Sequence, residues 1–275
     1  MSVGLIQLDL DGTLLTEEKI ISPATYAALE RAAAMGVHIV PATGRFYDAM
    51  PEVVRNLPFV RYVITVNGAQ IYDAQEKKVL HEEEISSQDA LRIYEYLDTL
   101  PALCDCYAQG WGHMERSYYE QIDRFVEDPH FLRMYKELRT PVDDMRAFLR
   151  SHKVQKLMVY FKDLDRRALE LERIPALFPH MAVSSAMPHN IEVNAGQANK
   201  GAAMRRLCAH LGVDSKDTMA FGDGSNDLTM IRTAGIGVAM GNAWQGLKDA
   251  ADYITLTNDE DGVAHAMEKF VFAKE

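Results

Sequence analysis

The sequence predicts an α/β fold, in which a parallel sheet with flanking helices is interrupted by an inserted α+β region. Short apolar runs alternate with helical segments at the start of the chain, and the same alternation returns after about residue 200. The region between them is less regular. A chain of 275 residues is long enough for two domains.

The first strand and helix are predicted from local signals. The apolar run Val3–Leu8 ends at acidic residues, as a buried strand does where it enters a loop. A helix is expected over 23–35, because Ser22 suits the N-cap and Pro23 the first helical position. Gly36 suits the left-handed residue that follows a helix.

Further segments continue the alternation of strand and helix. The early ones are a strand over 37–42, a helix over 46–56, a strand over 62–66 and a small hairpin near 71–72 and 79–80. The late ones are a helix over 201–211, a strand over 218–221, a helix over 226–233 and a strand over 236–239. This order indicates βαβ crossovers and a Rossmann-like parallel sheet.

The middle of the chain does not follow this pattern. Helical stretches are expected near 87–99 and 164–177, and strands near 157–161 and 181–185. We therefore expect a core formed by residues 1–81 and 188–275, with an α+β domain inserted over 82–187.

Composition narrows the classes of function. The chain has 29 Lys and Arg against 40 Asp and Glu, a net charge of −11, so its field repels nucleic acids and anionic membranes. An anionic ligand would need local attraction from a metal ion, a few cations or backbone N–H groups. Its three cysteines form no CxxC pair, and no secretory leader or long apolar run is evident, so we expect a cytoplasmic protein. The sequence gives no indication of an obligate protein partner.

The first candidate site residues are Asp9 and Asp11, in Asp-Leu-Asp-Gly-Thr at the end of the first strand. Residues two apart in extended backbone face the same side, so both carboxylates can reach the crevice beyond the strand. Two carboxylates this close favour a divalent cation, a shared proton or an acid/base pair. A solvated acidic turn is the alternative interpretation.

A second acidic cluster follows a late strand, in Gly-Asp-Gly-Ser-Asn-Asp. Asp223 is expected at the strand tip and Asp227 in the first turn of the next helix. Helix capping explains only part of this pattern. Carboxylates converging from two strand ends demand a cation, and oxygen ligands suit Mg²⁺ better than zinc.

Two more segments lie at similar positions. Thr43 and Gly44 follow the second strand, where a hydroxyl and backbone N–H groups can bind phosphoryl oxygens; a plain turn is the alternative. Lys200 opens a helix, against the helix dipole, which invites an anion; a solvated surface lysine is the alternative. Tyr107, Trp111, Tyr118 and Tyr119 are better explained as core than as a substrate pocket. No Walker A, GxSxG or dinucleotide fingerprint is present.

Together and in this order, these motifs resemble the haloacid dehalogenase superfamily. Its phosphatases carry Asp-x-Asp-Gly-Thr, a Ser or Thr after the second strand, a Lys and a late Gly-Asp-x-x-Asn-Asp. The Thr-Gly-Arg, the Asn-Lys-Gly after Glu192-Val193 and the Gly-Val-Ala-Met-Gly-Asn-Ala over 237–243 resemble Cof-type members with a C2-class cap. The resemblance covers the two core segments. For the insertion it extends only to location and size, a cap that would set substrate specificity.

The resemblance implies a phosphatase that hydrolyses small phosphorylated metabolites, sugar phosphates foremost. Asp9 would be the nucleophile that forms an aspartyl-phosphate, and Asp11 the acid and then the base. Mg²⁺ would be held by Asp9, the Asp11 carbonyl and Asp223, with Asp227 orienting the site. The implied phosphate-binding residues are Leu10, Thr43, Gly44, Lys200 and Asn226.

Two other functions share part of this pattern. A phosphomutase or phosphotransferase would carry the same motifs and return the phosphoryl group to a hydroxyl. A non-catalytic sensor of phosphometabolites would be favoured by a missing nucleophile or acid, and neither is missing.

Overall fold

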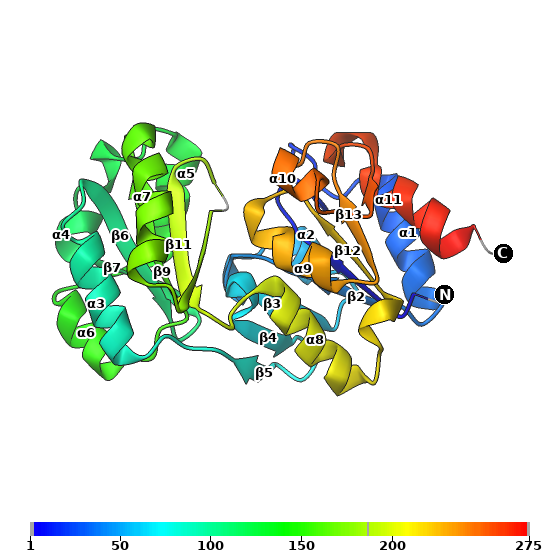
Figure 1. The fold of residues 1–275 in the computed structure, drawn as a ribbon, viewed down its shortest axis with the longest axis horizontal. Helices are drawn as coiled ribbons and strands as arrows, with labels where there is room; N and C mark the ends of the chain where they lie inside the picture. The colour runs from blue at the N-terminus through cyan, green and yellow to red at the C-terminus, as the bar shows by residue number, and fades with distance from the viewer. Residues whose placement is uncertain (1–2, 186, 274–275) are drawn as a thin grey trace. The chain divides into compact units, whose positions relative to one another are not determined.

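The computed structural model describes residues 3–185 and 187–273, and the chain forms two compact units (Figure 1). The first unit comprises the residues up to Arg45, then Met50–His81, and the chain from Asn199 onward. The second unit comprises Phe46–Ala49 and Glu82–Ala198.

The first unit is built around a five-stranded parallel sheet with strand order β14-β13-β12-β1-β2. Its strands are β1 Leu5–Leu8, β2 His38–Pro41, β12 Thr218–Gly222, β13 Ile236–Ala239 and β14 Tyr253–Ile254. Its helices are α1 Pro23–Ala34, α2 Glu52–Arg55, α8 Lys200–Leu211, α9 Leu228–Thr233, α10 Gln245–Lys248 and α11 Gly262–Met267. The parallel sheet and the predicted positions of α1, α8 and β13 are thus confirmed.

The order in which the chain adds strands reverses between the neighbouring strands β1 and β12, although all the strands are parallel. The chain passes from β1 through α1 to β2 on one side, and from β12 through α9 to β13 on the other. Right-handed crossovers place these two helices on opposite faces. In Figure 1, α1 lies beside α11 while α8 lies beside α9, in agreement with their contacts. Ligands bind at such a reversal, beyond the carboxyl ends of the strands.

The predicted third strand belongs to a different sheet. β3 Tyr62–Thr65 pairs antiparallel with β4 Gln70–Asp73, and β5 Lys78–Glu82 completes this three-stranded sheet. Only one parallel bridge, from Ala42 to Ile64, joins it to the end of β2 among the described residues. The tight turn after β3 brings β4 back beside it, so β3 pairs with β4 instead of extending the parallel sheet.

The helix expected over 46–56 is broken. A 3-10 turn covers Tyr47–Ala49, and only Glu52–Arg55 is α-helical. Pro51 has no N–H to donate, and it disfavours helical backbone at Met50, so the helix can start only after it.

The second unit contains a six-stranded sheet with order β10-β11-β9-β6-β7-β8. Its strands are β6 Ala102–Ala108, β7 Trp111–Glu115, β8 Arg139–Val142, β9 Lys156–Phe161, β10 Met181–Ser184 and β11 Asn190–Ala195. Its helices are α3 Ser87–Leu97, α4 Arg116–Tyr119, α5 Pro129–Glu137, α6 Met145–Ser151 and α7 Leu164–Leu177. It is an α+β unit, since all pairs but β7·β8 are antiparallel.

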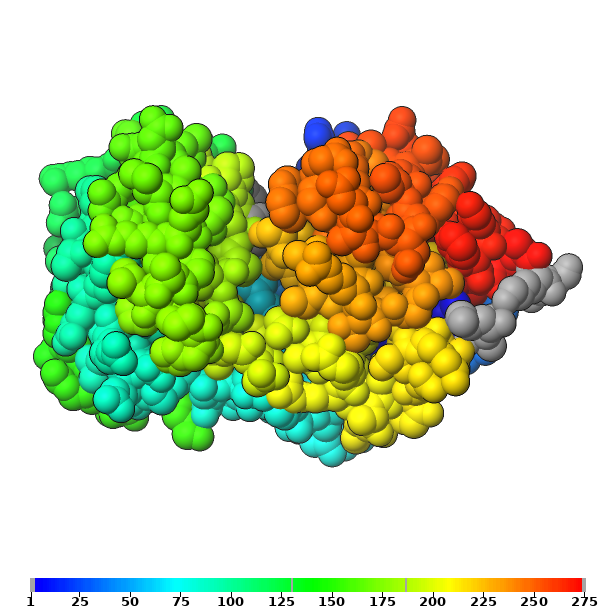
Figure 2. All heavy atoms as spheres, in the orientation of Figure 1, coloured from blue at the N-terminus to red at the C-terminus, as the bar shows by residue number. Residues whose placement is uncertain are grey.

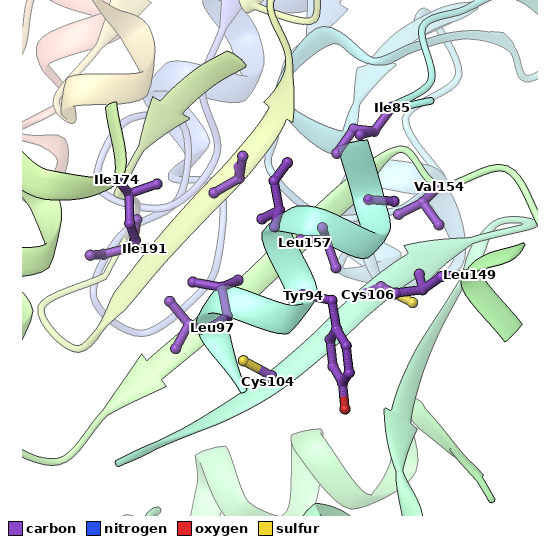
Figure 3. Close-up of a cluster of buried hydrophobic side chains, with 14 of the residues drawn as sticks. Ile85, Tyr94, Leu97, Cys104, Cys106, Leu149, Val154, Leu157, Ile174 and Ile191 are labelled. Atoms are coloured by element: carbon purple, nitrogen blue, oxygen red, sulfur yellow. The ribbon is translucent and has the colours of Figure 1, made fainter. Parts of the chain in front are cut away.

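Helices cover one face of this sheet and form its main core. Figure 3 shows Tyr94 and Leu97 of α3 lying against β6, where Cys104 and Cys106 face them, with Leu157 of β9 nearby. All are almost fully buried. Complete burial of one such apolar side chain stabilises a fold by about 1.5–3 kcal/mol.

The second unit ends later than the expected boundary at 187. The chain stays in this unit until Ala198 because β11 pairs with both β9 and β10. Its residues Ile191 and Val193 lie in the core under the helices.

None of the described helices is long and apolar enough to span a membrane.

Candidate active site

Asp9 follows β1, at the point of the parallel sheet where the strand order reverses. Leu5, Ile6 and Leu8 of this strand are inaccessible to solvent. In Figure 2, yellow and orange atoms of the chain after residue 199 form most of the visible face of this unit, and only a little of the blue N-terminal chain can be seen at its edges. The Asp9 N–H donates to the carbonyl of Phe221 in β12, with N and O 3.0 Å apart. This places its side chain beside the end of β12.

Lys200 is completely buried and joins the two acidic clusters. Its Nζ lies 2.5 Å from Oδ1 of Asp9 and 2.6 Å from Oδ1 of Asp227. Asn199 is the N-cap of α8, and its side chain accepts the N–H of Ala202. The solvated-lysine interpretation is therefore wrong: this ammonium neutralises buried carboxylates.

Asp227 holds the loop after β12 in place. Its Oδ2 accepts the backbone N–H groups of Asp223 at 3.0 Å and Gly224 at 2.9 Å, while Oδ1 binds Lys200. A Cβ on Gly222 would lie 2.4 Å from that of Asp227, so this position requires glycine. Both oxygens of Asp227 are thus occupied within the protein.

Asp223 faces the turn that follows Asp9. Thr13 donates to its Oδ1 at 3.0 Å. Gly12, at φ +80°, approaches so closely that a Cβ there would lie 2.5 Å from Oδ2. Within the described residues, Oδ2 of Asp223 and Oδ2 of Asp9 accept no hydrogen bond. Each carboxylate therefore keeps one oxygen for a ligand.

The acidic side chains fit a divalent cation. Oxygens of Asp9, Asp223 and Asp227 all lie within 4.8 Å of one another. Three carboxylates face the one ammonium of Lys200, which leaves an excess of two negative charges.

The pKa values of these carboxyls report the same imbalance. Burial raises the pKa of Asp9 well above its usual range; Lys200 opposes this, and the carboxylates of Asp227 and Asp223 add to it. Burial, followed by the charge of Asp227, raises the pKa of Asp223 to about 6. A bound cation would favour the ionised form of both.

Asp11 has a different environment. Its Oδ2 accepts from Nε and Nη2 of Arg45 at 3.0 and 2.9 Å, and its Oδ1 pairs with Lys19 at 2.9 Å. Burial alone would raise the pKa of Asp11, but these two cations hold it below the usual range. The pKa of Asp11 is therefore lowered while that of Asp9 is raised, although the two residues are only two positions apart in the sequence.

The predicted phosphate-binding residues surround the same strand ends. Thr43 is buried after β2, and its Oγ1 accepts the N–H of Arg45 at 3.2 Å. Leu10 is buried directly after Asp9, and Gly44 is half-buried beside Thr43. Asn226 donates to the side chain of Asn67 with N and O 3.3 Å apart.

The sequence did not identify several residues of this site. Arg45 and Lys19 bind Asp11, and Asn67 binds Asn226, yet none of the three was assigned a role. Arg45 stands directly after Thr43-Gly44, so its position in that motif was the available signal. Nothing in the local sequence of Lys19 indicates its partner.

Comparisons with known proteins identify the family of this chain. Residues 6–267 match the family model of haloacid dehalogenase-like hydrolases. The 5-amino-6-(5-phospho-D-ribitylamino)uracil phosphatase YcsE of Bacillus subtilis (strain 168) is 33% identical, with 98% of this chain and 97% of the relative covered. Phosphatase YwpJ of the same organism is 31% identical, with coverage of 96% and 98%.

Solved structures show the same fold. A haloacid dehalogenase-like hydrolase from B. subtilis superposes with a TM-score of 0.83 at 28% identity, covering 98% of this chain and 100% of the other. A sugar phosphatase of HAD subclass IIB superposes with a TM-score of 0.81 at 25% identity, covering 98% and 99%.

Proposed function

The chain belongs to the haloacid dehalogenase-like hydrolases and is a phosphatase of their Cof type, and from this premise we propose a Mg²⁺-dependent hydrolysis of small phosphate monoesters through an aspartyl-phosphate on Asp9. The observation that carries the proposal is the buried group of Asp9, Asp223 and Asp227, whose charge Lys200 balances only in part. This group is suited to a divalent cation and to a phosphoryl group that arrives with it.

Asp9 is the proposed nucleophile. Its Oδ1 is held by Lys200 at 2.5 Å, and its Oδ2 accepts no hydrogen bond within the part of the chain described, so one oxygen can attack phosphorus. The ester oxygen leaves with the bonding electron pair and takes up a proton. The acyl phosphate is then hydrolysed, which returns the Asp9 carboxylate and releases phosphate.

Asp11 is the proposed acid and base. Arg45 and Lys19 keep its carboxylate ionised in this arrangement, which suits the second step, in which it takes a proton from water. To protonate the leaving alkoxide in the first step, Asp11 must first gain a proton and give up these cations.

We propose that Asp9, the Asp11 carbonyl and Asp223 hold the Mg²⁺, with Asp227 fixing the loop. The assignment of Asp227 follows from its two occupied oxygens. When bound, the cation neutralises charge on the carboxylates and on the transferring phosphoryl group. Lys200 adds a positive charge there, and the remaining phosphoryl contacts are assigned to the backbone of Leu10 and Gly44 and the side chains of Thr43 and Asn226.

The proposed substrates are small phosphorylated metabolites, with sugar and sugar-alcohol phosphates foremost. Support comes from the sugar phosphatase among the similar structures and from the phosphorylated ribityl compound in the name of a relative. We propose that the second unit is a C2-type cap that selects the substrate. A cytoplasmic location is proposed as well, because the described cysteines Cys104, Cys106 and Cys208 are all unpaired and buried.

Phosphate release from p-nitrophenyl phosphate and a panel of sugar phosphates tests the proposal. We expect release with Mg²⁺, none with EDTA, and a loss of at least about 10³-fold in Asp9→Asn, because an amide cannot attack phosphorus. Far-ultraviolet circular dichroism checks that the variant is folded. Retained turnover in Asp9→Asn would exclude Asp9 as nucleophile, and transfer of phosphate to a second hydroxyl without free phosphate would indicate a mutase.

A further inference from the structure

The loop that joins β3 to β4 has an unusual backbone. It lies between Thr65 and Gln70, which pair in the sheet. Its first three residues, Val66, Asn67 and Gly68, have φ of +51°, +59° and +97°. Four-residue hairpin loops are usually built around a type I turn, whose central residues have negative φ. Left-handed backbone is especially unfavourable for a β-branched residue such as Val66. Such a conformation persists only where surrounding contacts impose it, commonly at functional sites.

Two other segments of the first unit impose this shape on the turn. The N–H of Asn67 donates to the carbonyl of Thr43, in the loop after β2, with N and O 2.9 Å apart. Gly68 lies so close to the start of α8 that a Cβ there would be 2.4 Å from the carbonyl group of Asn199. Figure 1 shows α8 beside β4, in agreement with their contacts. The turn therefore joins the loop of Thr43 to the helix that begins at Lys200.

The side chain of Asn67 contacts a third segment. It is buried, and its Oδ1 accepts from Nδ2 of Asn226, in the loop after β12, with the two atoms 3.3 Å apart. The oxygen of the Asn226 amide lies against its own loop, because a Cβ on Gly224 would be 2.8 Å from Oδ1 of Asn226. The nitrogen of Asn226 therefore faces the turn after β3. An amide nitrogen carries two hydrogens, so the bond to Asn67 uses only one of them.

The orientation of this amide matters for an anionic ligand. Asn226 is one of the proposed phosphoryl contacts, and only its nitrogen can donate to a phosphoryl oxygen. If the amide turned over, its carbonyl oxygen would face the anion and repel it. The side-chain oxygen of Asn67 opposes this rotation, because the turned amide would place two oxygens against each other.

We propose that Asn67 is a positioning residue of the phosphatase, which holds the amide of Asn226 with an N–H group toward the phosphoryl group. The left-handed turn fixes the place of Asn67, because the loop after β2 and the start of α8 hold the turn on both sides. The proposal rests on the phosphatase function proposed above, and it adds a residue that acts through Asn226 without touching the substrate. All of these residues belong to the first unit.

A double-mutant cycle tests whether Asn67 acts through Asn226. In Asn67→Gly the backbone can keep its left-handed conformation while the amide is lost. We expect kcat/KM for p-nitrophenyl phosphate, with Mg²⁺, to fall by about three- to tenfold, the contribution of one hydrogen bond. In the Asn226→Ala background the same substitution should have no further effect, because its partner is already absent. An equal loss in both backgrounds would overturn the proposal.

Two further variants separate the side chain of Asn67 from its backbone. Asn67→Ala also lacks the amide but disfavours left-handed backbone, so it should lose at least as much activity as Asn67→Gly. A loss confined to Asn67→Ala would mean that only the backbone matters, and it would overturn the proposal. Lys77→Gly is the matched control, because Lys77 is a left-handed residue of the same sheet, at φ +52° and exposed in the turn between β4 and β5. Its kcat/KM should equal that of the wild type.

The binding of inorganic phosphate separates this inference from the proposed function. Calorimetric titration in the presence of Mg²⁺ should give a Kd about three- to tenfold higher for Asn67→Gly than for the wild type and for Lys77→Gly. An unchanged Kd in Asn67→Gly would overturn the inference even if p-nitrophenyl phosphate is hydrolysed. A raised Kd in a protein without phosphatase activity would overturn the proposed function and leave Asn67 as a residue that positions a phosphate ligand.

Discussion

Lys200 connects carboxylates that come from distant parts of the chain. Asp9 and Asp227 lie 191 and 27 positions away from it in sequence, and all three side chains are buried. Burial alone would lower the pKa of the lysine, but Asp227 and Asp9 outweigh this and raise it, so the ammonium remains charged at neutral pH. The positive charge of Lys200 therefore offsets part of the free-energy cost of burying the carboxylates of Asp9 and Asp227.

Removing that charge should destabilise the protein. Lys200→Met leaves two buried carboxylates without their cation, and we expect the free energy of unfolding in EDTA to fall by about 3–5 kcal/mol. Urea denaturation measures the change. Lys216→Met is the control, because Lys216 pairs with Asp214 on the surface and its removal should have little effect. A similarly small effect of both variants would show that Lys200 does not stabilise the acidic cluster.

Asp11 should matter most when the leaving group is poor. Asp11→Asn cannot donate a proton, so we expect kcat with an alkyl phosphate to fall by about 10²–10⁴-fold and kcat with p-nitrophenyl phosphate to fall much less. Steady-state kinetics with both esters on the same preparation measures the difference. Equal losses for the two esters would contradict the assignment of Asp11 as the acid.

At the scale of single elements, the sheet formed by β3, β4 and β5 depends on a buried carboxylate at the end of β4. Asp73 is 1% exposed, and its Oδ2 accepts from Nε and Nη2 of Arg61 at 3.1 and 2.9 Å. Its Oδ1 accepts the N–H groups of Gln75 and Glu76 at 3.1 and 3.0 Å, which closes the turn. Burial alone would raise the pKa of Asp73, but these hydrogen bonds hold it below its usual range.

The lowered pKa fixes the pH range in which Asp73 stabilises the fold. A carboxyl whose pKa is lower when folded contributes stability above its unfolded pKa of about 3.9, and loses it as the pH falls through the folded value. Asp73→Asn should therefore cost about 1–3 kcal/mol at pH 7 and progressively less below about pH 4. Urea unfolding at pH 7 and pH 3 measures both values. An equal loss at both pH values would contradict the electrostatic origin.

A control for this experiment is Asp143→Asn. Asp143 pairs with Arg116, but its side chain is 81% exposed, so solvent screens the interaction. We expect little change in stability at either pH. A pH-dependent loss comparable to that of Asp73→Asn would show that exposed pairs matter as much as the buried carboxylate.

The elements of the first unit could be predicted because their signals are local. Ser22, Pro23 and Gly36 bound α1 as expected, with the Ser22 side chain accepting the N–H of Thr25 and Gly36 at φ +88°. In the second unit the signals are weaker. β6 is buried along its whole length, because one core lies on each of its faces, so its sequence shows no alternation of apolar and polar residues.

In the candidate site, too, only the residues with a local signal could be predicted from the sequence. Asp9, Asp223 and Lys200 stand where strands end or helices begin, and these positions can be recognised in the sequence. The motif position of Arg45 marks it as a residue of the site, but its pairing and that of Lys19 with Asp11 could not be recognised, because both depend on how the loops after β1 and β2 fold against each other. Tertiary contacts of this kind carry no periodic signal.

At the scale of the whole molecule, the two units should respond differently to Mg²⁺. The proposed ligands Asp9, Asp11 and Asp223 all belong to the first unit, although Asp9 and Asp223 lie more than 200 positions apart in the sequence. An ion that joins both ends of the chain stabilises only the folded state of that unit. Mass action gives about 2.7 kcal/mol when the free Mg²⁺ concentration is 100 times the Kd.

Differential scanning calorimetry tests this expectation without measuring activity. In EDTA-treated protein, Mg²⁺ should raise the Tm of the first unit by about 5 °C at that saturation, since 1 kcal/mol corresponds to about 2 °C or slightly more in a chain of this length. If the units unfold in separate transitions, that of the second unit should stay where it is. Asp223→Asn removes one proposed ligand and should abolish most of the shift, whereas Asp214→Asn, an exposed aspartate paired with Lys216, should retain it. A full shift in Asp223→Asn would mean that the ion binds elsewhere, and the metal assignment would then be wrong even if phosphate release required Mg²⁺.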